Sequence, residues 1–209
     1  MKWKTPLRNQ KGFTLIEIAI VLIIIGLILG ATVKGSDLIQ SAKQKKFYNN
    51  FVKQWEITTL NYLDRTGGLL GDGTINGGVA AAPNGYFDGI DNAGEFATIN
   101  TRLGQVGLEP PPITAIGTNY QYSIKGRTSG TRTVAIQLYQ RNSIENAVNI
   151  PNNVLRFVTM PTDLALALDG MIDGTTNGSL GKFRQDPNGA WPNAATTPTV
   201  TAMYILDVP

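Results

Sequence analysis

The chain has 209 residues, of which 42% are hydrophobic and only 16% are charged, and it contains no Cys and no His. The lack of these two residue types excludes thiol catalysis, disulfides, and the commonest general base and metal ligand. The formal net charge is +3, but four of the 18 basic residues lie in the first twelve positions, and the remaining 14 face 15 acidic residues. We therefore expect neither an enzyme nor a nucleic-acid partner.

An apolar segment of about 21 residues runs from Phe13 to Val33, and as a helix of roughly 31 Å it is long enough to cross a bilayer. A secretory signal peptide would have a shorter apolar region followed by an A-x-A-like cleavage site. A plain transmembrane anchor explains the length of the segment but not Glu17, because a carboxylate inside a span is normally retained for a function.

The start of this segment, residues 11–17 with the sequence KGFTLIE, resembles the type IV prepilin motif. That motif is a short basic leader ending in Gly, followed by Phe-Thr-Leu-Ile-Glu and a long apolar run. The resemblance implies cleavage between Gly12 and Phe13 by a prepilin peptidase on the cytoplasmic side, and N-methylation of the new Phe13 amine. It also implies that the apolar helix is retained in the mature protein.

Glu17 is predicted to act in assembly. Cleavage would expose an α-amine on Phe13 with a reference pKa of about 8. Burial of the Glu17 carboxylate alone, or of the Phe13 ammonium alone, is unfavourable. A pair formed between neighbouring subunits offsets both penalties and sets the axial register. The alternative interpretation is that Glu17 only snorkels to the membrane edge.

The orientation in the membrane rests on the processing motif. Basic residues precede the span, which favours a cytoplasmic N-terminus. However, four lysines also follow it, so that the count of basic residues hardly separates the two orientations: Lys34, Lys43, Lys45 and Lys46. We expect a single-pass protein of the bacterial inner membrane with a cytoplasmic N-terminus, which later joins a periplasmic or extracellular filament.

The helix is expected to continue to Arg65, because neither Pro nor Gly occurs between Ser36 and Arg65, and to end at Gly67 and Gly68. Residues at helical spacing predict a face that packs against a sheet. These residues are Tyr48, Phe51, Val52, Trp55, Thr59 and Tyr62.

The rest of the chain predicts loops followed by strands. Residues 66–118 are rich in Gly, Asn, Asp and Pro and predict loops, with a short helix over 95–108. A second short helix is expected over 161–168, with Thr162 as its N-cap. Strands are predicted over 120–125, 133–140, 154–160 and 203–208, with a turn at 127–132.

The predicted fold class is α+β, with a long N-terminal helix, first transmembrane and then amphipathic, packed on a C-terminal antiparallel sheet. The expected parts are a cleaved basic leader, a transmembrane or filament-core helix, an amphipathic continuation of that helix, and a globular pilin-like domain. They cover residues 1–12, 13–34, 35–65 and 66–209.

Acidic turns in the loops are candidate calcium sites. The run from Asp72 to Gly77 has oxygen-bearing residues at alternate positions and Gly at the sixth, which partly imitates a calcium-binding loop. The alternative is turn chemistry, which favours Asp, Asn and Gly without any metal. No cofactor is expected to be required, and the candidate ligands are Asp72, Asn76, Asp88 and Asp91.

The expected function is that of a structural subunit of a type IV pilus, polymerised through its N-terminal helix. A pseudopilin of a type II secretion or DNA-uptake system would have the same features. A single-span membrane-anchored adhesin or binding module is the alternative from a different class. The expected partners are copies of itself or other pilins, the prepilin peptidase and methyltransferase, an inner-membrane assembly platform, and the lipid bilayer before assembly.

Overall fold

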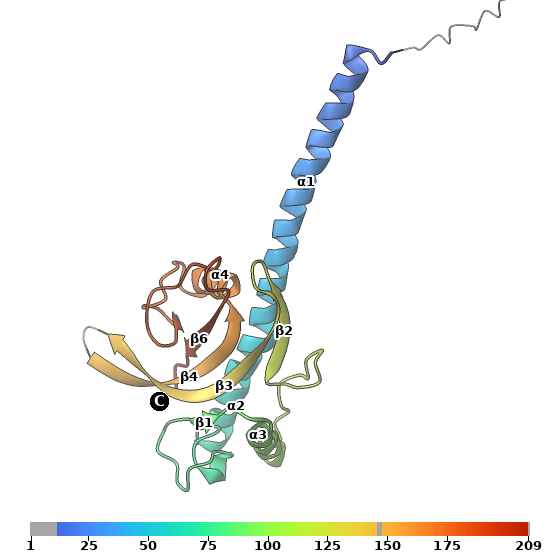
Figure 1. Cartoon of the computed structure of the whole chain (residues 1–209). Helices are drawn as coiled ribbons and strands as arrows, with labels where there is room; N and C mark the ends of the chain where they lie inside the picture. The colour runs from blue at the N-terminus through green and yellow to red at the C-terminus, as the bar shows by residue number, and fades with distance from the viewer. Residues whose placement is uncertain (1–11, 146–147, 209) are drawn as a thin grey trace, which may run out of the picture. The chain divides into compact units, whose positions relative to one another are not determined.

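The computed structural model describes residues 12–145 and 148–208, and the chain divides into two compact units at the junction of Ala42 and Lys43. Helical residues follow one another from Leu15 to Thr66. They comprise α1 (Leu15–Phe47), a π-helical turn η1 (Tyr48–Val52) and α2 (Lys53–Thr66), as Figure 1 shows. The long N-terminal helix predicted from the sequence is confirmed.

The helix ends at Gly67, as predicted. Gly67 has a φ of 73°, in the left-handed region, and its N–H donates to the Leu63 carbonyl at 2.7 Å. Glycine adopts this conformation without the steric penalty that a Cβ atom brings, and the hydrogen bond satisfies one of the free carbonyls at the helix end.

All strand pairs among the described residues are antiparallel, and they form one sheet with the order β1-β3-β4-β6-β5. β2 pairs with the same edge of β3 as β1, because Ala135 of β3 pairs with Gln121 of β2 on one side and with Val158 of β4 on the other. The strands are β1 (Asp88–Ile90), β2 (Gln121–Gly126), β3 (Gly130–Glu145), β4 (Val148–Pro161), β5 (Phe183–Gln185) and β6 (Thr199–Ile205).

The β3–β4 hairpin is longer than the sequence predicts. Strands were expected over 133–140 and 154–160, but Gln140–Glu145 also pair with Val148–Asn153, beyond the pairing of β1 with β3 and of β4 with β6. The predicted limits were wrong because this stretch is rich in Asn and holds a Pro, and both residue types are depleted in strands. β1 and β5, of three residues each, were not predicted.

Two short helices complete the fold. In α3 (Ala93–Gln105), the Asn92 side chain accepts from the Glu95 N–H, and the Glu95 carboxylate accepts from the Asn92 N–H, which forms a capping box. The N-cap of α4 (Thr162–Ile172) is Pro161, which is still paired with β6, so the expectation that Thr162 caps this helix is wrong. The Thr162 hydroxyl donates to the Thr197 carbonyl instead.

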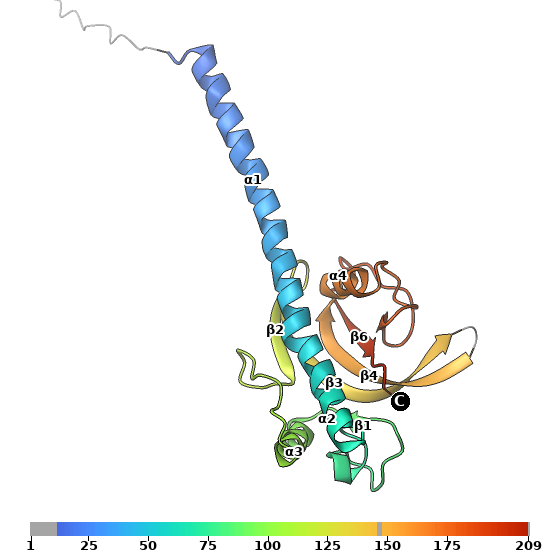
Figure 2. The ribbon, with the colours of Figure 1, turned by 180° about the vertical axis from the view of Figure 1, so that it is seen from behind.

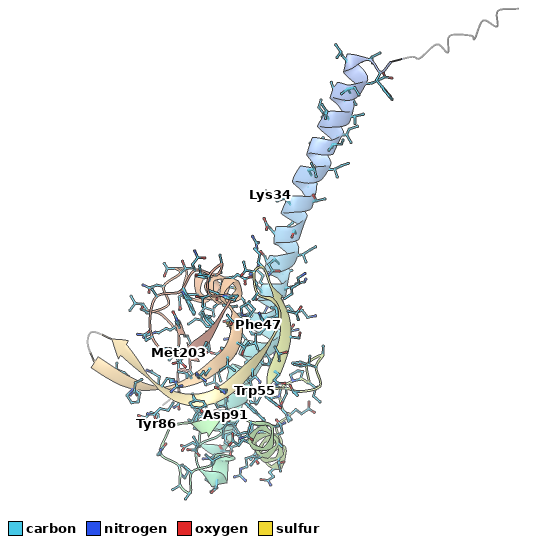
Figure 3. The ribbon with its side chains drawn as sticks, viewed as in Figure 1. Lys34, Phe47, Trp55, Tyr86, Asp91 and Met203 are labelled. Atoms are coloured by element: carbon cyan, nitrogen blue, oxygen red, sulfur yellow. The ribbon has the colours of Figure 1, made fainter. Side chains whose placement is uncertain are left out.

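The core lies between the second half of the helix and one face of the sheet. Of the predicted face, Phe51, Val52, Trp55, Thr59 and Tyr62 are buried, whereas Tyr48 is half-buried. Figure 2 shows α2 across β3, and Figure 3 labels Phe47, the last residue of α1, and Trp55 in α2. The Phe47 and Phe157 rings lie 6.3 Å apart, and Trp55 Nε1 donates to the Asn119 carbonyl at 2.8 Å. Each such ring contributes roughly 1.5–3 kcal/mol on burial.

Candidate functional site: the exposed N-terminal helix

The first part of α1 exposes apolar side chains in every direction. Phe13 is 84% exposed and Leu15 is 93% exposed, and the other large apolar residues up to Val33 are exposed as well. Within the described residues, the helical run that begins at Leu15 is long and apolar enough to cross a membrane. A helix that is apolar on all faces needs lipid or protein around it, because water does not solvate such a surface favourably.

Thr14 and Glu17 fix the start of this helix. The backbone N–H and the hydroxyl of Thr14 both donate to Glu17 Oε2 at 2.7 Å, and the Glu17 N–H donates to Thr14 Oγ1 at 3.3 Å. This is the reciprocal pattern of a capping box, in which the first residues of a helix satisfy each other's free N–H groups. Glu17 therefore has a local role that neither the assembly nor the snorkelling interpretation includes.

The other carboxylate oxygen of Glu17, Oε1, accepts no hydrogen bond from the residues that the structure describes. Gly12 and Phe13 lie just before the helix in exposed, non-helical backbone. A peptidase reaches such an accessible, non-helical segment more readily, because a peptide bond inside a helix is already hydrogen-bonded. The arrangement leaves the predicted cleavage site open and one oxygen of Glu17 available to a cation.

The family model of the prokaryotic N-terminal methylation motif matches residues 7–33. This motif is the leader signature of type IV pilins, and it supports a type IV pilin-like or pseudopilin protein. It supports anchoring in a membrane and points to a structural subunit rather than an enzyme. No curated protein and no solved structure matches the chain.

Asp72 and Asn76 form hydrogen bonds inside the loop that follows α2. Asp72 is buried, and its Oδ1 and Oδ2 accept from the Asn84 and Gly85 N–H groups at 2.8 and 2.7 Å. Asn76 Oδ1 accepts from the Tyr62 hydroxyl at 3.0 Å, and its Nδ2 donates to the Asp72 carbonyl at 2.9 Å. Hydrogen bonding within the loop, the alternative to calcium, therefore explains the positions of both side chains.

Asp88 and Asp91 also have protein partners. Asp88 Oδ2 accepts from the Gly73 and Ala80 N–H groups, both at 2.8 Å, and Asp91 Oδ2 accepts from the Tyr139 hydroxyl at 3.0 Å. In the part of the chain that the structure describes, no three or more Asp or Glu side chains are close enough to hold a metal ion. The structure thus does not bring Asp72, Asp88 and Asp91 together at one site, and calcium binding stays a prediction.

A buried carboxylate that sequence reasoning missed joins the helix to the last strand. Both oxygens of Glu56 accept from the Tyr204 hydroxyl at 3.1 Å, and Lys53 and Lys182 form ion pairs with the same carboxylate. Burial, and then the adjacent Glu56 charge, raise the pKa of Tyr204 well above its ordinary value. Tyr204 thus remains a hydrogen-bond donor, and the cluster holds α2 against β6.

Proposed function

We propose that this chain is a structural subunit of a type IV pilus, cleaved after Gly12, methylated at Phe13 and polymerised through its N-terminal helix. The observation that carries the proposal is the fully exposed apolar helix that begins directly after a processing motif. Lipid covers this surface while the subunit is anchored in the inner membrane with its N-terminus in the cytoplasm. Helices of neighbouring subunits cover it in the filament, which lies in the periplasm or outside the cell.

Glu17 supplies a negative charge that favours transfer of the helix from lipid to a filament position beside another subunit's N-terminus. Its Oε2 stays with Thr14 and keeps the helix start intact, while Oε1 accepts from the Phe13 ammonium of the next subunit. Neither charge is then buried alone, which would cost several kcal/mol. The partners are other copies of the chain or other pilins, the prepilin peptidase and methyltransferase, and an inner-membrane assembly platform.

A pseudopilin of a type II secretion or DNA-uptake system is the second candidate within the same class, since the methylation motif serves it equally well. A membrane-anchored adhesin or binding module is the candidate from another class. It would need an apolar span, but it would need neither a processed N-terminus nor a carboxylate inside the span.

Processing is tested by mass spectrometry of the N-terminus. We expect the mature chain to begin with methylated Phe13, and Gly12→Glu to leave the full-length precursor in the inner membrane, because a charged side chain does not enter a tight peptidase site. Nothing lies within 4 Å of a Cβ atom built on Gly12, so the substitution does not disturb the described fold.

Gly12→Ala is the matched control for this experiment. It adds a single methyl group at the same position, and we expect cleavage of this variant to persist. A mature N-terminus at Phe13 in Gly12→Glu would show that the leader has been assigned wrongly.

A further inference from the structure

Three lysines from two parts of the globular unit line one depression of its surface. Lys43 and Lys46 come from the end of α1, and Lys125 comes from β2. The depression has a volume of about 280 Å³, and all three lysines are exposed. Lys46 also lines an adjoining depression of about 250 Å³, in which Asn50 and Ser123 offer further hydrogen-bond donors.

Two of the three lysines, Lys43 and Lys46, carry positive charge that no described acidic side chain pairs with. In the residues that the structure describes, neither Lys43 nor Lys46 takes part in an ion pair or hydrogen bond. No acidic residue occurs between Leu38 and Val52. Asp163, in the first turn of α4, accepts from the Arg127 backbone N–H through its Oδ2 at 2.9 Å. A compact anion with several oxygens is the ligand that such a group of ammonium ions favours.

The position of these lysines in the chain indicates where the anion comes from. Lys43 follows Val33, the last residue of the apolar span, by ten residues, which is about 15 Å along a helix. The headgroup layer extends roughly 5–8 Å beyond the hydrocarbon. The distance that remains between the backbone of Lys43 and this layer is reduced by helix tilt and by the length of the lysine side chain. Lys and Arg are usually more frequent on the cytoplasmic side of a span than on the translocated side. A group of lysines on the translocated side therefore suggests a function.

We propose that this lysine-lined depression binds the phosphate of an anionic phospholipid headgroup on the periplasmic side while the subunit is anchored in the membrane. The lysines bind the phosphate, and the aromatic edge of Tyr122 contacts the glycerol part of the lipid. Bound lipid holds the globular unit against the membrane until assembly draws the subunit out. The proposal requires the anchored state of the proposed function but not filament formation.

The test uses the full-length chain in nanodiscs that contain phosphatidylcholine and phosphatidylglycerol, followed by native mass spectrometry of the lipids that the chain retains. We expect the wild type to retain phosphatidylglycerol preferentially. Lys46→Gln should lower this preference about fivefold, which corresponds to about 1 kcal/mol for one lysine near an anionic surface. Lys43→Gln with Lys46→Gln should lower it further.

Lys45→Gln is the matched control. Lys45 is equally exposed, lies next to Lys46 and carries the same charge, but it does not line the depression. The proposal predicts that Lys45→Gln retains lipid like the wild type. Equal losses in Lys45→Gln and Lys46→Gln would mean that diffuse charge alone attracts the lipid, and they would overturn the proposed site.

Two further measurements distinguish lipid from other sources of phosphate and a failed site from failed membrane insertion. In nanodiscs of phosphatidylcholine alone, neither inorganic phosphate nor a short DNA duplex should bind in a way that depends on Lys46. Binding of either one that Lys46→Gln abolishes would replace the lipid as the occupant and overturn the proposal. The yield of chain inserted into nanodiscs reports membrane anchoring separately, so a failure of the proposed function is distinguishable from a failure of this site.

Discussion

Two carboxylates to which functional roles were assigned, Glu17 and Asp72, accept hydrogen bonds from their own helix start or loop. Glu17 binds Thr14, and Asp72 binds the N–H groups of Asn84 and Gly85. For a buried carboxylate such as Asp72, a hydrogen bond from a backbone N–H contributes about 1.5–3 kcal/mol, more than most surface ion pairs. These local roles compete with the functional roles that the same residues suggest.

Calcium binding at the acidic turns is tested through Asp72. Both of its oxygens already accept hydrogen bonds. We therefore expect Asp72→Ala to lower the thermal unfolding temperature of the full chain in detergent equally in calcium and in EDTA. A metal site would instead give the wild type, but not the variant, a higher unfolding temperature in millimolar calcium.

Asp169 makes the stability of the globular unit depend on pH. Its side chain is fully buried, it accepts from Trp191 Nε1, and burial raises its pKa above the ordinary value. The folded state then holds this proton more tightly than the unfolded state. The contribution of the neutral carboxyl group to stability is present below a pH of about 4 and is lost as the pH rises through the raised pKa.

Asp169→Asn removes this titration, because the amide stays neutral and its oxygen still accepts from Trp191. We expect the variant and the wild type to unfold at similar temperatures near pH 4, and the variant to become the more stable of the two as the pH approaches neutrality. Asp64→Asn removes an exposed carboxylate and is the control. A stability difference between Asp169→Asn and the wild type that does not change with pH would contradict this role of Asp169.

At the scale of elements, the loop between α2 and β1 is a compact unit that depends on glycine. A Cβ atom on Gly78 would lie 2.2 Å from Asp88 Oδ2 and 2.7 Å from the Gly71 carbonyl oxygen. Asp88 cannot move away without losing the Gly73 and Ala80 N–H groups that it binds. The loop is thus closed around its carboxylates rather than arranged around an open cavity.

Gly78→Ala is expected to lower the free energy of unfolding by about 1–3 kcal/mol, because the loop must shift and its hydrogen bonds lengthen. Chemical denaturation of the full chain in detergent measures this change. Gly104→Ala in α3 is the control, since its Cβ atom meets nothing within 4 Å and alanine favours a helix. Gly104→Ala should be neutral or stabilising, and a Gly78→Ala protein as stable as the wild type would show that the loop adapts.

Strong periodicity made the long helix, its aromatic face and its end at Gly67 predictable from the sequence, whereas short or polar elements were not. β1 and β5 are three residues long, so only their partners in the sheet define them. The Thr14–Glu17 capping box has the signature Thr-x-x-Glu before an apolar run, so this part of the site could be predicted from the sequence. The Glu56–Tyr204 contact joins residues 148 positions apart, which no local pattern reports.

At the scale of the whole molecule, two kinds of surface belong to one chain. The unit that begins at Lys43 buries its own core. The apolar residues between Leu15 and Val33 are all exposed and gain nothing from the rest of the chain. Burial of apolar surface contributes roughly 25 cal/mol per Å². Covering this helix is therefore strongly favourable, first by lipid in the membrane and then by other subunits in the proposed filament.

The measurement that tests assembly most directly is the amount of filament in sheared and pelleted material from cells that make Glu17→Val or Glu17→Gln, compared with the mature protein in their membranes. Glutamine preserves the capping box but not the charge, whereas valine removes both. If Glu17 pairs with the Phe13 ammonium of a neighbour, both variants should be cleaved and retained in the membrane, and neither should form filament. Normal filament from Glu17→Gln would contradict the account, because it would reduce Glu17 to the capping of its own helix.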